Sequence, residues 1–452
     1  MNTCELTKDI KLTELLFDGK KAFKYIEKMA VDIGTRPSGS EAEKKTAEWI
    51  VSEFKSMGLK TTIEEFEVTT GRVVSQGLMV LEPYLEDVGC EVMPLYGSTG
   101  PDGVTGELVY LETYDEEYLT LDVAGKIIMT SGRPQNIKKS YNLLSKLKPK
   151  AMIFIETSPK VLAKNLWGSH LVKEKYGEFP AIRITFGDAL KLLESEAKKV
   201  HVTAETETMT VNSQNVIAEL RGSERPEEVV VIGGHYDTVL EVAGAGDNAG
   251  GTAIAMELAR VFKEKGTKRT MKFAAWGCEE LGLLGSRDYA TKLRKASEEA
   301  KKEDEDDDQT ELDRTVLCVN LDVHGGYIGT NSSRVLGPPE LTASVKLLSK
   351  ETGKVFTVNE GVYSSDGTSL SAVGIPSVSL SRGTPTNQLM HSVEDDIRWL
   401  NPKALQDQGE FIELFLTRYV ANAAGFPFER TIPEKQKKEI EDYFKRSMRK
   451  LP

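Results

Sequence analysis

Near-continuous apolar runs alternate with segments of helical periodicity from Asn215 onward. The runs read NVIAEL, EEVVVIGG, MKFAAW, TVLCVNLD and IPSVSLS, and runs without a polar face are typical of strands that are buried on both sides. Between them, helical spacing recurs at about 249–265, 281–298, 339–352 and 402–421. This alternation predicts an α/β fold with a mostly parallel central sheet flanked by helices.

The N-terminal part of the chain also has helical spacing, interrupted by the turn GTRPSGS at 34–40. Ser40 can cap a helix, because its hydroxyl can accept a hydrogen bond from a free N–H of the first turn. That helix is expected to run to about Met57, with Gly58 as its stop. The strand-like segment TTIEEFEV follows it.

The pattern changes between about Gly71 and Glu205, where short β-type runs and turn signals dominate. GELVYLE, GKIIMTSG and KAMIFIE are such runs, and helical spacing at 136–148 separates the last two. The resulting strand–helix–strand rhythm predicts a smaller, β-rich domain at 71–205. We expect it to be inserted into a catalytic domain formed by 1–70 and 206–452.

Composition agrees with two globular domains. A chain of 452 residues is longer than one core usually supports. A net charge of −12 disfavours a nucleic-acid surface.

The charge-broken N-terminus and the absence of a long apolar stretch predict neither a secretion signal nor a membrane span. The four cysteines have no paired spacing, which favours reduced thiols in the cytoplasm. The acidic run KKEDEDDD at 301–308 is typical of a solvated loop.

Six ionisable side chains lie at wide intervals, and most of them follow a strand-like run. In parallel sheets the ligand site lies beyond the carboxyl ends of the strands. A two-metal hydrolase needs a bridging carboxylate, further imidazole or carboxylate ligands, and a base. Taken singly, each residue is more often a hydrogen-bonding or capping group, but six together favour a metal centre. They are His235, Asp247, Glu279, Glu280, Asp322 and His391.

Two sequence details add to this centre. Asp237 lies two residues after His235, on the same side of an extended chain, where it can accept the imidazole N–H and orient the ring. Glu279 and Glu280 are adjacent, so their side chains point in different directions. One of them can therefore bind metal while the other accepts a proton.

The motifs around these residues resemble the M28 family of zinc peptidases. They are GHYD, GAGDNAGG with its aspartate twelve residues after the histidine, WGCEELGLLGS, NLD and MHS. The resemblance extends to TRPSGSEAEKKTAEWI and GIPSVSLS, and the middle segment resembles a protease-associated (PA) domain. The family includes aminopeptidases, carboxypeptidases and glutaminyl cyclases.

The resemblance implies two zinc ions, with cobalt or manganese as alternatives. Asp247 would bridge the two ions. His235 and Asp322 would complete one metal site, while Glu280 and His391 would complete the other.

The resemblance also implies roles in catalysis. Glu279 would be the general base that deprotonates the attacking water and then protonates the leaving amine. The Asp247–Asn248 peptide bond would be cis. A tyrosine that often precedes the last histidine ligand in relatives is Met390 here, so the oxyanion donor is open; Tyr363 is a candidate, with packing as its alternative.

Two further residues have open interpretations. Arg382, nine residues before His391, could bind a substrate carboxylate bidentately, as a carboxypeptidase requires, or could form a structural ion pair. His324 follows Asp322 on the same strand face. It could contact substrate or a metal ligand, or it could be a simple hydrogen-bonding histidine.

The favoured function is a cytoplasmic metallo-aminopeptidase that removes N-terminal residues from peptides. The alternatives are a carboxypeptidase or dipeptidase that uses Arg382, a glutaminyl cyclase, and a binding module without activity. A complete two-metal ligand set disfavours the cyclase, and the presence of Glu279 disfavours the binding module. We expect peptide substrates and no nucleic-acid or membrane partner. The amphipathic C-terminal helix around Ile440 and Phe444 would serve internal packing or a homo-oligomer contact.

Overall fold

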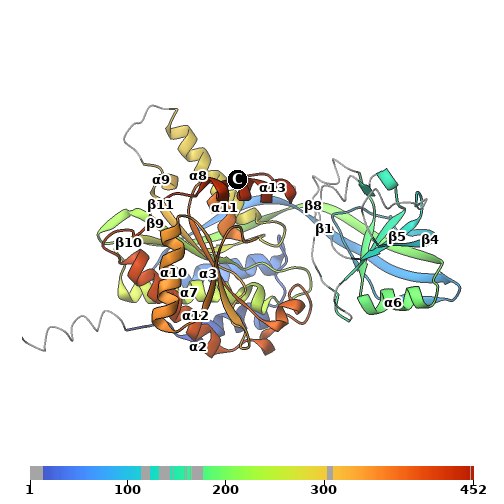
Figure 1. Ribbon diagram of the computed structural model, residues 1–452, viewed down its shortest axis with the longest axis horizontal. Coiled ribbons are helices and arrows are strands. Elements are labelled where there is room, and N and C mark those ends of the chain that lie inside the picture. The colour runs from blue at the N-terminus through green and yellow to red at the C-terminus, as the bar shows by residue number, and fades with distance from the viewer. Residues whose placement is uncertain are drawn as a thin grey trace, which may run out of the picture.

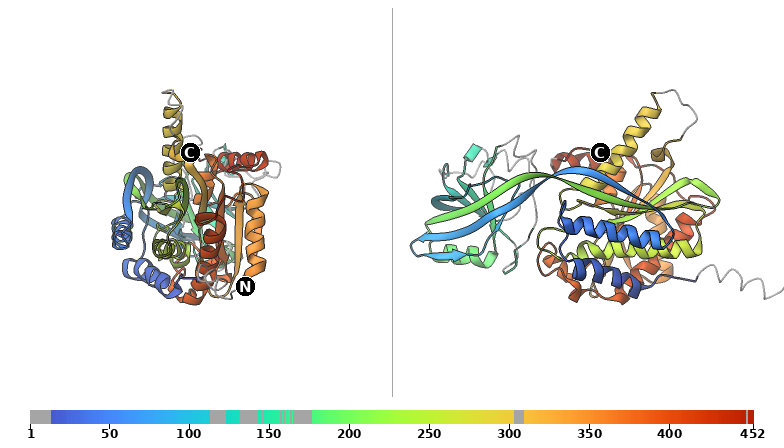
Figure 2. Two further views of the ribbon diagram at one scale, coloured as in Figure 1. Left: turned by 90° about the vertical axis from the view of Figure 1, so that its left-hand side faces the viewer. Right: turned by 180° about the vertical axis from the view of Figure 1, so that it is seen from behind.

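Two lobes make up the molecule, and two long antiparallel strands run from one lobe into the other. These are β1 (Lys60–Glu82) and β8 (Lys199–Leu220), as Figures 1 and 2 show. The computed structural model describes residues 14–452 except 113–122, 132–142, 145, 157, 159, 163, 165–176, 303–308 and 448. The domain boundaries predicted at 70/71 and 205/206 fall inside these two strands.

The larger lobe is built on the strand order β13-β12-β14-β11-β9-β10-β8. Strand β9 is parallel to both of its neighbours, and the β11–β14 and β12–β13 pairs are also parallel, whereas β12–β14 and β8–β10 are antiparallel. The predicted central, mostly parallel sheet is therefore confirmed. Its strands, besides β8, are β9 (Arg225–His235), β10 (Arg269–Trp276), β11 (Thr315–Leu321), β12 (Thr330–Leu336), β13 (Phe356–Glu360) and β14 (Ser377–Gly383).

Helices cover both faces of this sheet, as predicted (Figure 1). The predicted segments 249–265, 281–298 and 339–352 correspond to α7, α8 and α10, and 402–421 corresponds to α12 followed by the π-helical turn η7. The helices are α2 (Gly19–Ile26), η2 (Glu27–Ile33), α3 (Glu41–Ser56), α7 (Gly250–Lys265), α8 (Leu284–Ala300), α9 (Glu311–Arg314), α10 (Pro339–Thr352), α11 (Asp366–Ala372), α12 (Pro402–Phe415), η7 (Leu416–Ala421) and α13 (Glu434–Arg446).

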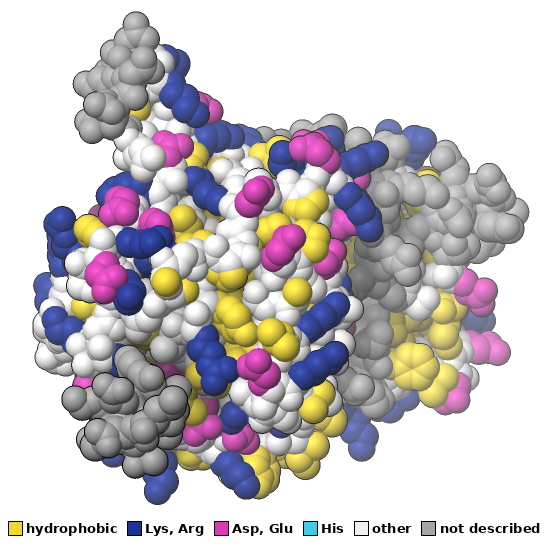
Figure 3. Space-filling model, turned by 60° about the vertical axis from the view of Figure 1, so that its left-hand side comes forward, with side chains coloured by type: hydrophobic (Ala, Val, Ile, Leu, Met, Phe, Trp, Pro, Cys, Tyr) yellow, Lys and Arg dark blue, Asp and Glu magenta, His cyan; other side chains and the backbone are white. Residues whose placement is uncertain are grey.

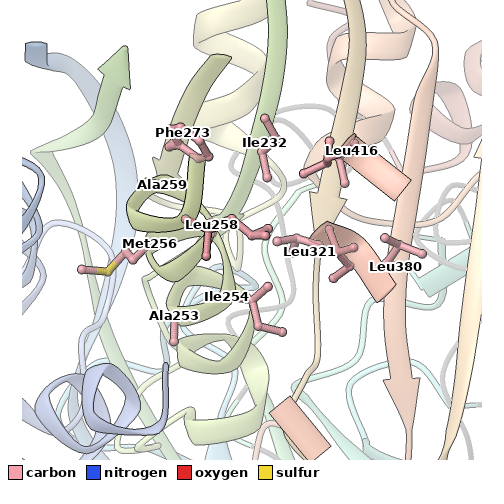
Figure 4. Close-up of a cluster of buried hydrophobic side chains, with 14 of the residues drawn as sticks. Ile232, Ala253, Ile254, Met256, Leu258, Ala259, Phe273, Leu321, Leu380 and Leu416 are labelled. Atoms are coloured by element: carbon pink, nitrogen blue, oxygen red, sulfur yellow. The ribbon is translucent and has the colours of Figure 1, made fainter. Parts of the chain in front are cut away.

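The apolar run of β9 is explained by its two buried faces. Val230 and Ile232 pack into one core with α7, whereas Val229 and Val231 pack into another with α8 and α11. Figure 4 shows Ile232 beside the apolar side chains of α7. Because side chains alternate along a strand, a strand covered on both sides leaves no position for a polar residue.

Local signals at the helix ends match the structure as well. The Ser40 hydroxyl accepts a hydrogen bond from the Glu43 N–H at 3.1 Å and caps α3. The helix ends at Ser56, two residues before Gly58, whose φ is +73°. In α13, Ile440 and Phe444 are buried in an internal cluster, so this apolar face packs within the chain.

The smaller lobe continues the sheet and has cores of its own. Strands β4, β5, β6 and β7 are successively parallel, β3 is antiparallel to β7, and β4 is antiparallel to β8. GELVYLE overlaps most of β4, and GKIIMTSG and KAMIFIE contain β5 and β6. The bounds are β2 (Glu86–Val88), β3 (Glu91–Val92), β4 (Val104–Leu111), β5 (Ile127–Ser131), β6 (Ala151–Ile155), β7 (Ala181–Ile184) and α6 (Phe186–Glu194).

Two predicted segments lie largely outside the described residues, namely the helix at 136–148 and the acidic loop at 301–308. On the face shown in Figure 3, basic and acidic side chains are interspersed rather than gathered by sign. Within the described part of the chain, no helix has the length and apolar character to cross a membrane.

Ile232→Ala tests the core of the larger lobe. The Ile232 side chain is fully buried, so its truncation should lower the free energy of unfolding by about 2–5 kcal/mol. Urea unfolding followed by circular dichroism measures the change. Ile63→Ala, at a half-exposed position in β1, is the matched control and should cost less than about 1 kcal/mol. Equal losses would contradict the packing described above.

Candidate active site

The six predicted residues lie together at the carboxyl ends of the central strands of the larger lobe. Parallel strands deliver their following residues to the same edge of the sheet, which explains why distant positions meet. His235 ends β9, Glu279 and Glu280 follow β10, and Asp322 follows β11. Asp247 lies in the turn η4 (Ala245–Ala249), whose backbone is not helical at Asp247 and Asn248. His391 follows β14 and the 3₁₀ helix η5 (Pro385–Leu389).

Asp247 lies between the two imidazoles. Its Oδ1 is 3.2 Å from His235 Nε2, and its Oδ2 is 3.0 Å from His391 Nε2. Asp322 Oδ1 is 3.5 Å from His235 Nε2, and Glu280 Oε2 is 3.2 Å from His391 Nε2. Each carboxylate oxygen of Asp247 thus faces a different imidazole–carboxylate pair, as the predicted bridging role requires.

These donors fit a divalent cation such as zinc. Imidazole nitrogens and carboxylate oxygens are zinc ligands. Ligand atoms of His235, Glu279 and Asp322 form one compact group, and those of Asp247, Glu280 and His391 form a second. Asp322 Oδ1 and Glu280 Oε1 are buried without a hydrogen-bond partner among the described residues. Buried, unpaired carboxylate oxygens are costly, and a cation would satisfy them.

The electrostatics of the centre reflect the excess of carboxylates. Burial raises the pKa of Glu279 well above its usual range, although the nearby His235 opposes the shift. Burial alone would lower the pKa of His391, but Glu280 and Asp247 outweigh it and raise that pKa well above its ordinary value. The protein therefore favours positive charge at this position.

Asp237 organises both sides of the centre. Its Oδ1 lies 3.4 Å from His235 Nδ1, and its main-chain carbonyl oxygen lies 3.3 Å from the same nitrogen. The same carboxylate accepts the main-chain N–H groups of Glu279 at 3.0 Å and Glu280 at 3.2 Å, and the Ser38 hydroxyl at 3.0 Å. One buried side chain therefore fixes the histidine and the glutamate pair relative to each other.

Arg36 explains why the turn GTRPSGS belongs to the site. Its guanidinium is fully buried and donates to five main-chain carbonyl groups, three of them in the segment that joins β9 to η4. Burial lowers the pKa of Arg36 to about 10, while Asp237 and Asp395 oppose the shift. The N-terminal turn thereby supports the loop that carries Asp247.

Sequence reasoning missed two buried acids near the centre. Asp395 accepts the N–H groups of Gly246 at 3.0 Å and Asp247 at 3.1 Å. Burial raises its pKa to about 7, and the charge of Asp247 adds to the shift. Burial likewise raises the pKa of Asp366 to about 7, and His235 opposes it. Neither residue follows an apolar run at a recognisable spacing, so the sequence contained no signal for them.

The turn at Asp247 has the expected backbone. The Asp247–Asn248 peptide bond is cis, as the family resemblance implied. The Asn248 side chain donates to the carbonyl oxygen of Leu321 and accepts the N–H groups of Gly251 and Val323. It therefore joins the turn to the end of β11, beside Asp322.

Part of the chain is similar to a known family. Residues 215–416, which contain all six residues of the centre, match the model of peptidase family M28. Aminopeptidase YwaD of Bacillus subtilis is 26% identical over 95% of this chain and 90% of its own length. Carboxypeptidase Q of Mus musculus is 26% identical over 57% of this chain and 58% of its own length.

The fold is shared with solved structures. The crystal structure of a zinc aminopeptidase from Bacillus subtilis superposes with a TM-score of 0.74 at 24% identity, covering 94% of this chain and 100% of that chain. This likeness extends beyond the M28 segment into both lobes, since it covers nearly the whole chain.

A pocket whose lining includes Asp247 and Met390 adjoins the candidate centre. Arg382 lines it, but the guanidinium donates to the carbonyl oxygens of Gly326 and Tyr327 and to Asn331 Oδ1. Arg382 therefore holds the loop before β12 through hydrogen bonds. Its role is structural, but it uses hydrogen bonds rather than the ion pair considered from the sequence.

His324 and Tyr363 differ in their surroundings. His324 is buried, with Nδ1 3.1 Å from Gln408 Oε1 and Nε2 2.9 Å from the carbonyl oxygen of Leu380. These contacts are those of a hydrogen-bonding histidine. Burial raises the pKa of Tyr363 well above its ordinary value, and Asp322 and Asp247 add to the shift. The charges of the centre therefore act on the phenol of Tyr363.

Asp237→Asn tests the organising role of that carboxylate. An amide would turn one acceptor into a donor that faces main-chain N–H groups, so the glutamate pair should shift and zinc affinity should fall about 10–100-fold. Competition with a chelating dye measures the affinity. Asp18→Asn, which keeps an N-cap on α2, is the control. Unchanged zinc affinity in Asp237→Asn would show that the ligands keep their positions without this carboxylate.

Proposed function

We propose that this chain is a zinc-dependent aminopeptidase that removes N-terminal residues from peptides and uses two metal ions. The observation that carries the proposal is the division of the ligand atoms into two groups that meet at the carboxylate of Asp247. The relationship to aminopeptidase YwaD over 95% of the chain supports the choice among M28 activities.

The proposed ligands are the residues that the sequence singled out. His235 and Asp322 would hold one ion, Glu280 and His391 the other, and Asp247 would contact both. When bound, the ions supply Lewis-acid polarisation of the scissile carbonyl and activation of water.

Glu279 is the proposed general base. Its carboxylate lies 3.9 Å from His235 Nε2, and its raised pKa suits a group that accepts a proton from the attacking water and returns it to the leaving amine. Asp237 holds the main chain of Glu279, so the base is fixed before substrate arrives. Tyr363 is the proposed donor to the oxyanion, in the role that Met390 cannot fill.

The carboxypeptidase alternative has less support from the site. It needs a cation that receives the substrate carboxylate, and the Arg382 guanidinium already donates to three acceptors of the neighbouring loop. The relationship to carboxypeptidase Q covers only 57% of this chain. A cyclase or a binding module gains no support from any contact described above.

The proposal extends to three features of the whole chain. The smaller lobe would be a PA-like domain, which its parallel strands β4–β7 support. A cytoplasmic location is supported by the free, buried thiols of Cys90, Cys278 and Cys318. Cobalt or manganese could replace zinc, and metal analysis of the purified protein decides this point.

Metal removal and substrate blocking test the activity. Chelation should abolish hydrolysis of aminoacyl p-nitroanilides, and zinc or cobalt should restore it, because the proposed chemistry needs the cations. Peptides with a free N-terminus should be cleaved and N-acetylated ones should not. Equal cleavage of acetylated peptides, together with a raised KM for free-carboxylate substrates in Arg382→Ala, would instead establish a carboxypeptidase.

Glu279→Gln tests the proposed base. The amide keeps the size of the side chain but cannot accept the proton, so kcat should fall about 10²–10⁴-fold. Metal content, measured by mass spectrometry, should stay unchanged. Glu360→Gln, at an exposed position in β13, is the matched control. Normal turnover in Glu279→Gln would refute the mechanism.

A further inference from the structure

One residue of the smaller lobe contacts the active-site loops of the larger lobe. The main-chain N–H of Lys164 donates to the carbonyl oxygen of His391 at 2.7 Å. The Lys164 ammonium binds Glu241 Oε2 at 2.8 Å and also binds the carboxylate of Glu91. Its side chain is 13% exposed, so the lysine lies at a largely dry junction between the lobes.

The segment that carries Lys164 is attached to the smaller lobe. It follows β6, and the N–H of Glu156 donates to the carbonyl oxygen of Ile184 at the end of β7. Ser158 accepts the N–H of Phe186. Glu91, which binds the ammonium, lies in β3 and pairs with β7. The ammonium of Lys164 is therefore linked to the sheet of the smaller lobe through Glu91.

Both partners of Lys164 in the larger lobe belong to ligand-bearing loops. Glu241 lies in the segment between His235 and Asp247, and its φ is +59°. His391 has a φ of +61°. Side-chain-bearing residues rarely adopt such backbone conformations, which persist where the surroundings impose them. Lys164 contacts both strained residues, and so it joins the loop of Asp247 to the loop of His391.

The charges around the ammonium strengthen the junction. An exposed ion pair contributes little, but a mostly buried ammonium shared by two carboxylates forms stronger, charge-assisted hydrogen bonds. His391 Nε2 lies 3.0 Å from Asp247 Oδ2. Because metal ligands must be held to within about 0.5 Å, small movements of either loop would disturb this pair.

We propose that Lys164 is a positioning residue through which the smaller lobe holds His391 and Asp247 in the geometry that retains zinc. This inference rests on the proposed function, because it assigns those two residues as ligands. It gives the smaller lobe a role in completing the metal centre.

Zinc release from the purified full chain tests this role. Lys164→Met removes the charge and keeps the length of the side chain, Lys164→Arg keeps the charge, and Glu241→Gln breaks only the ion pair across the lobes. Lys126→Met is the matched control, since the Lys126 ammonium pairs with Glu107 at 3.1 Å inside the smaller lobe. The zinc-loaded variants are mixed with a chelating dye, and kcat and KM are measured separately.

Lys164→Met and Glu241→Gln should release zinc about 10–100-fold faster than the unaltered chain, and kcat should fall while KM changes little. Lys164→Arg and Lys126→Met should behave as the unaltered chain does. Release from Lys164→Met and Glu241→Gln at the rate of Lys126→Met would overturn the inference. If Lys164→Met fails to fold, the zinc-release rate of Glu241→Gln decides between the two outcomes. The Glu241 side chain is 71% exposed, so this variant should fold. Zinc release needs no substrate, so a chain that holds zinc without cleaving peptides would refute the proposed function alone.

Discussion

Four carboxylates lie within reach of two imidazoles at the carboxyl ends of β9, β10 and β11, and like charges repel strongly in a poorly solvated site. The surrounding protein adds further acids. Asp237 and Asp395 are buried beside the centre, yet both accept main-chain N–H groups of the loops that carry the ligands. The acids around the centre therefore have two tasks: some form the candidate metal centre, and others fix the backbone. Bound cations would balance such a group of charges.

The fold supplies the scaffold that this group of charges requires. Because β9 is buried on both faces and is parallel to its neighbours, its end is rigid, and His235 is delivered from a strand rather than a mobile loop. The ligands that come from loops are secured differently. Arg36 donates to the carbonyl groups on one side of η4, and the Asn248 side chain ties the other side to β11. The end of β9 and the loops supported by Arg36 and Asn248 thus meet at one edge of the sheet.

Periodicity and spacing were enough to predict the central sheet and the residues that follow its strands, such as His235 and Asp322. They were not enough for the supporting contacts. Arg36 binds main-chain carbonyl groups. Because every residue has such a group, the sequence does not indicate which residues will bind the guanidinium. Asp395 lies in the acidic stretch VEDD and looks there like a solvated residue. Strand β1 continues to Glu82, because pairing with β8 holds a segment whose own pattern weakens after Val68.

The two lobes are joined by a ribbon of only two strands where β1 and β8 pass between them, and its register shifts between Val73 and Ser75. Two-stranded ribbons twist readily, so the ribbon alone would leave the relative orientation of the lobes weakly defined. The contact of Lys164 with Glu241 and His391 is a further link between the lobes and restricts that freedom. A loop of the smaller lobe is therefore part of the environment of His391, and lobe orientation and metal geometry depend on each other.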